Sequence, residues 1–173
     1  MKLSNEEQYF FHCMYFNDFE AALDSLRLIK RYRRVDTKAA LLRDLTVAYI
    51  RPFSKNKGRG GSKSELDMKV VPAHLRGLHK ELYELRNQQF AHTDLNYYNP
   101  KSITYGDTSG GLVYAGFSYE GLLEKLPEIK ELVEAVKRVV DARIQEYESA
   151  GFDLKHTAAI KVDPVKAALL GLL

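Results

Sequence analysis

The stretch HLRGLHKELYELRNQQFAHTD, residues 74–94, is the part of this 173-residue sequence that decides its fold. Its leucines step by three, four and three residues, the spacing of a narrow apolar seam by which one helix packs on another. The seam consists of Leu75, Leu78, Leu82 and Leu85. At its polar end the same stretch carries Arg86, Asn87 and His92. The sequence therefore predicts a packed helix with a polar end.

The start of the chain predicts a further helical region. Ser4 or Asn5, followed by two glutamates, is typical of a helix start. Apolar residues then recur at helical spacing, which fits either one long helix or two helices that break near residues 17–18.

Another helix is expected over residues 38–50, with Asp36 or Thr37 as its cap and Pro52 as its stop. After a glycine-rich loop, a short helical turn is expected up to about residue 71. Pro72 then suits the first turn of the central helix.

The segment after the central helix, residues 96–117, is rich in turn-forming pairs such as Asn-Pro, Gly-Asp and Gly-Gly. Short strands are expected at Ile103-Thr-Tyr and Leu112-Val-Tyr, around a DTSGG turn. We interpret the segment as an irregular insert or a small β-hairpin.

A last long helix is expected from about Pro127 to Ser149, with Gly151 as its C-terminal cap. The elements together predict an all-α protein, an up-and-down bundle of four to five helices, as a single domain at residues 1–151. Residues 152–173 are expected to be a C-terminal extension with one short helix, at residues 164–172.

Composition narrows the class of protein. Apolar residues make up 45% and charged residues 28% of the chain, which is ordinary for a globular domain. Cys13 is the one cysteine, so no disulfide within the chain is expected, and no Cys/His spacing suggests zinc. The start of the chain does not resemble a signal peptide, and no apolar run approaches the ~20 residues that span a bilayer. We therefore expect no membrane association and a cytoplasmic location.

The net charge of +3 is small, but the basic residues are clustered in two segments. Residues 30–34, KRYRR, follow the first helix, and the loop at residues 53–63 carries four positive charges and no negative one. Both segments are interpreted either as solvated basic surface or as contacts to an RNA backbone. The candidate RNA-binding residues are Lys30, Arg31, Arg33, Arg34, Lys55, Lys57, Arg59 and Lys63.

The residue types at the end of the central helix suit phosphodiester chemistry. A histidine can exchange a proton near neutral pH, and an arginine grips phosphate oxygens with a planar fork. In an ideal α-helix, however, His92 lies about 120° around the axis from Arg86 and ~9 Å further along. We therefore expect the site to form more readily between two copies of the chain. The alternative is that these side chains only cap and solvate the helix end.

His79 lies seven residues before Arg86 and so on nearly the same helical face. It is interpreted as a surface histidine or as a supporting residue of a groove, together with Asp94. His12 and Cys13 are adjacent in sequence and point about 100° apart on a helix, so they do not indicate a catalytic dyad.

The sequence Leu85-Arg-Asn-Gln-Gln-Phe-Ala-His-Thr-Asp94 resembles the signature of HEPN-domain proteins, in particular their abortive-infection, AbiU-like branch. In that signature an arginine and a polar residue are followed by a histidine at the end of a bundle helix. Five residues separate Arg86 from His92 here, and Asn87 is the polar residue. The resemblance covers about ten residues, with a helical pattern around them, and does not extend to the insert.

The resemblance implies a dimeric endoribonuclease that needs no metal or cofactor, often a toxin or an antiviral effector. Arg86 would stabilise the phosphate charge, His92 would transfer a proton, and Asn87 would support both. The expected products carry a 2′,3′-cyclic phosphate and a 5′-hydroxyl. The implied partners are RNA, a second copy of the chain, and an antitoxin or regulator. The alternative is a non-catalytic RNA-binding or protein-interaction module of the same shape.

Overall fold

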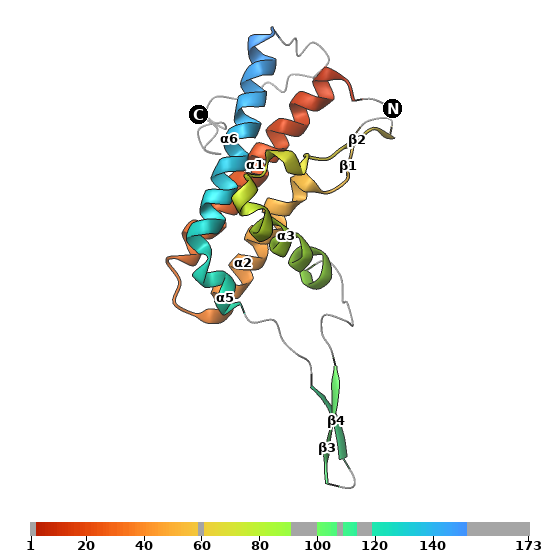
Figure 1. The fold of residues 1–173 in the computed structure, drawn as a ribbon, viewed down its shortest axis with the longest axis vertical. Coiled ribbons are helices and arrows are strands. Elements are labelled where there is room, and N and C mark those ends of the chain that lie inside the picture. The colour runs from red at the N-terminus through yellow and green to blue at the C-terminus, as the bar shows by residue number, and fades with distance from the viewer. Residues whose placement is uncertain (1–2, 59–60, 91–99, 107–108, 114–118, 152–173) are drawn as a thin grey trace, which may run out of the picture.

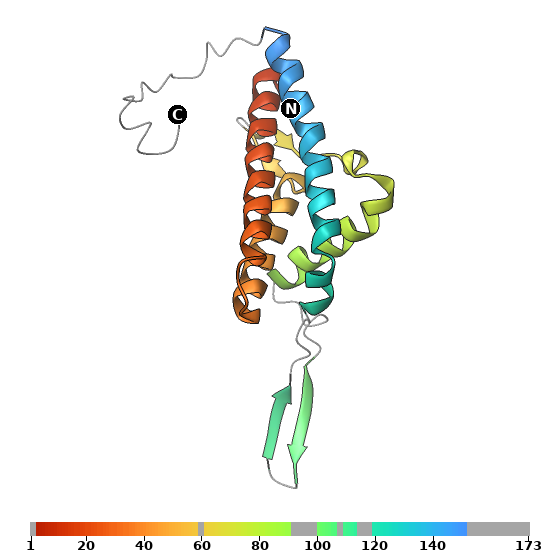
Figure 2. The same ribbon diagram turned by 90° about the vertical axis from the view of Figure 1, so that its left-hand side faces the viewer.

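The computed structural model describes five segments of the chain: residues 3–58, 61–90, 100–106, 109–113 and 119–151. These segments are mostly helical, which confirms the expected all-α class. Three long helices lie side by side and the shorter α3 packs against one of them (Figures 1 and 2). They are α1 (Asn5–Ile29), α2 (Val35–Ile50), α3 (Arg76–Leu85) and α6 (Leu126–Ser149).

Helix α1 is continuous, so the second of the two expectations, a break near residues 17–18, is wrong. Ser4 is its N-cap: the Ser4 hydroxyl accepts a hydrogen bond from the Glu7 backbone N–H at 3.1 Å. The Glu7 carboxylate in turn accepts from the Ser4 backbone N–H at 3.2 Å. This reciprocal capping satisfies two of the backbone donors that a helix start leaves open.

Helix α2 begins at Val35, three residues earlier than expected, and neither Asp36 nor Thr37 caps it. Asp36 instead lies in the first turn, where its carboxylate accepts from the Thr37 backbone N–H at 2.8 Å and pairs with Arg34. An acid in the first turn offsets the positive end of a helix much as a cap does. The sequence pattern around Asp36 therefore fits both positions, and the predicted helix start lies three residues too late. The helix ends at Ile50, and Pro52 lies in a short 3-10 helix, η1 (Arg51–Phe53), as its stop signal predicted.

The leucine seam of α3 is confirmed, since all four of its leucines are buried. Pro72 precedes a 3-10 turn, η4 (Ala73–Leu75), which leads directly into α3. Another 3-10 turn, η3 (Met68–Val70), stands where the short helical turn was expected. The last helix is preceded by a short helix, α5 (Glu120–Glu124). Gly151 follows α6 with φ 69°, the left-handed conformation that glycine adopts at a helix end.

Two small antiparallel hairpins complete the described chain. In the basic loop, β1 (Asn56–Lys57) pairs with β2 (Lys63–Ser64). In the insert, β3 (Lys101–Tyr105) pairs with β4 (Ser109–Val113), so the hairpin interpretation of this segment is confirmed. Gly110 and Gly111 belong to β4 and not to the turn, because they pair with the backbone of β3. This hairpin lies beyond one end of the helices in both views (Figures 1 and 2).

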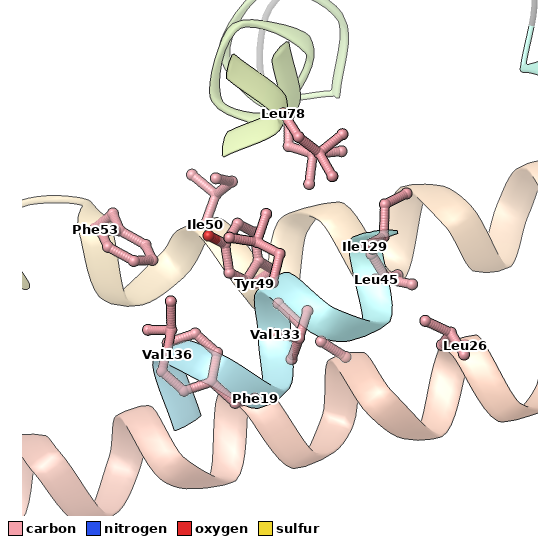
Figure 3. Close-up of a cluster of buried hydrophobic side chains, with 14 of the residues drawn as sticks. Phe19, Leu26, Leu45, Tyr49, Ile50, Phe53, Leu78, Ile129, Val133 and Val136 are labelled. Atoms are coloured by element: carbon pink, nitrogen blue, oxygen red, sulfur yellow. The ribbon is translucent and has the colours of Figure 1, made fainter. Parts of the chain in front are cut away.

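The hydrophobic core lies where α1, α2, α3 and α6 meet (Figure 3). Phe19 from α1, Tyr49 from α2 and Val133 from α6 are fully buried there, and Leu78 reaches the cluster from α3 (Figure 3). No described helix is long and apolar enough to cross a membrane. The expected C-terminal extension lies outside the described residues.

Candidate phosphate-binding site at the end of α3

Arg86 and Asn87 lie in a single π-helical turn, η5 (Arg86–Phe90), that directly follows α3. Both side chains are half-buried, and Arg86 Nη1 donates to Asn87 Oδ1 at 2.8 Å. The amide oxygen takes up only part of the donor capacity of the guanidinium. Arg86 forms no ion pair with a carboxylate within the described segments, so its charge is available to an anion.

Packing on α2 and a ring stack hold this turn against the rest of the bundle, and an ion pair holds the helix that precedes it. Leu85, the last residue of α3, is buried, and η5 packs along α2. Phe90 stacks on Tyr119, just before α5, with ring centroids 6.4 Å apart and planes 2° from parallel. Lys125 Nζ lies 2.9 Å from Glu81 Oε2 and ties the start of α6 to α3. The arginine therefore sits on a fixed part of the scaffold.

The π turn changes the geometry that the sequence predicted. The α-helix ends at Leu85, so the ideal-helix angle between Arg86 and His92 rested on a wrong assumption about residues 86–90. An i→i+5 turn advances less per residue around the axis, and such turns are frequent at functional sites. His92 and Asp94 lie outside the described residues.

His79 is not a surface residue, so that alternative of its interpretation is wrong. Its role as a supporting residue of a groove stays a prediction, and it lines a small cavity beside α3. Only 3% of His79 is exposed, and its Nδ1 lies 2.8 Å from Tyr49 Oη in the interface between α2 and α3. Burial lowers the pKa of His79 to about 4, so the ring is neutral at physiological pH. The sequence pattern does not reveal that α2 covers the part of α3 that carries His79.

The two basic segments lie at different ends of the bundle. The β1–β2 loop is tied to the first half of α1, because Ser62 Oγ donates to Glu7 Oε1 at 2.9 Å and Tyr15 Oη donates to Ser64 Oγ at 2.6 Å. Residues 30–34 follow the other end of α1, about 35 Å further along the helix. Figure 1 places this α1–α2 connection, α5 and the end of α3 in the same half of the molecule. Only residues 30–34 therefore share an end of the bundle with Arg86.

The side chains of residues 30–34 are exposed. Arg34 is engaged, since its guanidinium bonds both carboxylate oxygens of Asp36. Lys30, Arg31 and Arg33 have no acidic partner among the residues that the structure describes. In the other segment Lys55, Lys57 and Lys63 are exposed as well, and Arg59 lies outside the described residues.

Metal chemistry finds no support in the described segments, which contain no group of three His, Cys, Asp or Glu side chains able to hold an ion. His12 Nδ1 bonds the Gln8 carbonyl oxygen at 2.6 Å, and the Cys13 thiol has its side-chain hydrogen bond with Tyr9. Burial raises the pKa of the Cys13 thiol, which disfavours the reactive thiolate.

Of the cavities that the described residues form, two lie beside β1 and beside α3, and neither is predicted by the sequence. One of about 620 Å³ lies between α1 and β1, with mostly apolar walls that include Phe10 and Met14. The other, of about 210 Å³, adjoins α3 and is lined in part by His79 and Tyr83. The sequence does not predict these cavities, because the residues that line each of them come from separate segments of the chain.

A half-buried guanidinium without a carboxylate, beside an amide at a fixed helix end, can bind a phosphate and neutralise charge that develops on it. The neighbouring cationic segment can hold further phosphates of the same strand. Comparisons of the chain with models of protein families, with curated proteins and with solved structures found no match.

Proposed function

We propose that this protein is a HEPN-type endoribonuclease that cleaves RNA without a metal ion. The observation that carries the proposal is Arg86, a half-buried guanidinium whose one hydrogen-bond partner among the described residues is the neutral amide of Asn87. A structural arginine at such a depth is usually neutralised by a carboxylate, whereas an anion-binding arginine is left open for its ligand. The motif around it supplies the histidine that proton transfer requires.

In the proposed reaction, His92 accepts the proton of the ribose 2′-hydroxyl, and O2′ attacks the adjacent phosphorus. The P–O5′ bond breaks, and the leaving oxygen takes a proton to become a 5′-hydroxyl. The phosphorus keeps O2′ and O3′ as a 2′,3′-cyclic phosphate. Arg86 stabilises the negative charge of the pentacoordinate transition state, and Asn87 orients the guanidinium through its hydrogen bond.

We further propose a homodimer with a composite site, and a role as a toxin or defence effector restrained by an antitoxin or regulator. These proposals rest on the resemblance of the motif. The angle between Arg86 and His92 in an ideal α-helix gives no support to the dimer, because η5 is not α-helical. Sedimentation at micromolar concentration tests it: a single species near the 19.8 kDa of one chain would contradict a dimer.

The reaction is tested by the chemistry of its products. Purified protein is incubated with fluorescent RNA in excess chelator, and the product ends are identified by mass. The proposal expects cyclic phosphate ends, and no cleavage of the same RNA with 2′-O-methyl riboses. Cleavage of the 2′-O-methyl RNA, or products with 3′-hydroxyl ends, would exclude attack by the 2′-oxygen.

A second candidate function is RNA binding without cleavage. The exposed cations of residues 30–34, three of which have no acidic partner within the described segments, favour it. Salt-dependent binding of RNA, unchanged by His92→Ala and without product over long incubation, would support this function over the first.

A further inference from the structure

The cavity beside α3 has aromatic and apolar walls with polar groups at its edge. Phe53, Met68, His79 and Tyr83 supply the walls, and Glu65 and Lys80 contribute a carboxylate and an ammonium group. Its volume, about 210 Å³, lies below the range of about 300–1,000 Å³ that is typical of sites for drug-sized ligands. A cavity of this size suits one flat ring system.

The aromatic rings that line this cavity contact one another. Phe53 packs edge-on against His79 with ring centroids 4.5 Å apart. The Tyr83 ring lies 6.3 Å from the His79 ring, with their planes 28° apart. Phe53 and His79 are buried, whereas 39% of Tyr83 is exposed. Tyr83 can therefore cover a ligand ring while the other two form a rigid base, as in protein sites that stack unpaired nucleobases.

His79 offers the cavity a hydrogen-bond donor. The Tyr49 hydroxyl is buried and has no other partner within the described segments, so its proton would lack an acceptor unless it is donated to His79 Nδ1. A neutral histidine that accepts at Nδ1 carries its proton on Nε2. Nε2 itself has no partner among the described residues. An almost wholly buried ring that lines the cavity thus carries one unused N–H.

The cavity lies against α3, the helix that leads into the turn carrying Arg86. Tyr83 and Arg86 are three residues apart and so neighbours on the helix surface. His79 precedes Arg86 by about 10 Å along the helix axis. A base held at His79 and Tyr83 would therefore belong to a nucleotide close to the phosphate that Arg86 binds.

We propose that this cavity binds a single nucleobase of the RNA substrate and prefers guanine. The identity of the ligand as RNA rests on the proposed function. Guanine presents two adjacent donors, N1–H and the N2 amino group, which one carboxylate can accept together, and Glu65 supplies that carboxylate. Guanine also offers O6 and N7 as acceptors for an N–H donor such as His79 Nε2. Adenine, cytosine and uracil each lack the adjacent pair of donors.

The test measures binding of labelled hexanucleotides with 2′-O-methyl riboses, so that cleavage does not interfere. One guanine in an oligouridine background is expected to tighten binding about tenfold over oligouridine. Inosine, which lacks the N2 amino group, is expected to lose most of that gain. Glu65→Gln abolishes the preference, and Glu124→Gln, a matched change at an exposed glutamate of α5, leaves it intact. Tyr83→Ala weakens binding of every guanine-containing strand, and Tyr83→Phe preserves it.

Equal affinity for the guanine and uridine strands, or an undiminished preference in Glu65→Gln, would overturn the proposal. The failure of the base-binding proposal can be distinguished from the failure of the proposed ribonuclease function. Cleavage of ordinary RNA without base preference would overturn the base-binding cavity alone. A guanine preference in a protein that cleaves no RNA supports the cavity and overturns the ribonuclease.

Discussion

Tyr49 Oη and His79 Nδ1 lie 2.8 Å apart in the buried interface between α2 and α3. Tyr49 is wholly buried and His79 almost so, with Phe53 packed edge-on against the His79 ring and tilted against the Tyr49 ring. This hydrogen bond joins α3, the helix that leads into the turn carrying Arg86, to the core. It also explains why a histidine stands in the packed face of α3, since an apolar residue there would leave the Tyr49 hydroxyl unsatisfied.

The coupling between these two residues can be measured with Tyr49→Phe, His79→Phe and the double variant. Each single change leaves one buried polar group unpaired and is expected to lower the free energy of unfolding by about 1–3 kcal/mol. The double variant should lose less than the sum, with a coupling of about 1 kcal/mol in urea unfolding. Strictly additive losses would show that the bond is not formed.

The pH dependence of stability should carry the signature of His79. Its pKa is about 4 in the folded protein and 6.5 in the unfolded chain, so the unfolded state takes up the proton first as pH falls. The stabilisation is fully present above pH 6.5, and up to about 3 kcal/mol is lost as the pH falls to 4. The double variant Tyr49→Phe/His79→Phe should lack this component. His74→Gln, a change at an exposed histidine, should keep it.

Two glycines should respond to alanine in opposite directions. At Gly58 a methyl group would collide with Ser62 Oγ and lie 2.8 Å from Glu7 Oε1, where the loop is tied to α1. Gly58→Ala should therefore cost about 1–3 kcal/mol. At Gly77, in the first turn of α3, a methyl group meets nothing, and alanine should add up to about 1 kcal/mol through helix propensity. Urea unfolding of both variants measures these changes in the free energy of unfolding. Equal changes in the two variants would contradict the prediction.

The different positions of the basic segments predict different contributions to RNA binding. The triple variant Lys30→Ala/Arg31→Ala/Arg33→Ala removes three cations from the end that carries Arg86. It should reduce the slope of log affinity against log salt by about 2, as expected for three lost phosphate contacts to a single strand. The matched variant Lys55→Ala/Lys57→Ala/Lys63→Ala should change the slope less for strands short enough to stay near Arg86. Equal reductions on such strands would argue against a site at that end.

Features of the fold that depend on neighbours in sequence were predictable. The leucine spacing of α3, the stop at Pro52 and the glycine after α6 each act through local backbone chemistry or a simple helical period. The start of α2 was misplaced because Asp36 caps and first-turn acids look alike in sequence.

Features that depend on tertiary contacts were not predictable. Helical spacing predicts that His79 and Arg86 share a face, but it does not reveal that Tyr49 from α2 packs against His79. The π turn at Arg86 has no reliable sequence signal, because tertiary contacts stabilise it. These contacts are the packing of η5 on α2 and the stack of Phe90 on Tyr119. The cavity beside α3 likewise draws Glu65 and Tyr83 together from separate parts of the chain.

The most direct test of the account is the rate of RNA cleavage in excess chelator by the wild-type protein, Arg86→Ala and Arg76→Ala. Arg76 is an exposed arginine at the start of α3, the helix that ends just before Arg86, and serves as the matched control. We expect Arg86→Ala to lower the rate at least about 100-fold, the effect of removing a group that stabilises transition-state charge, and Arg76→Ala to leave it nearly unchanged. Cleavage by folded Arg86→Ala at the wild-type rate would contradict the central claim.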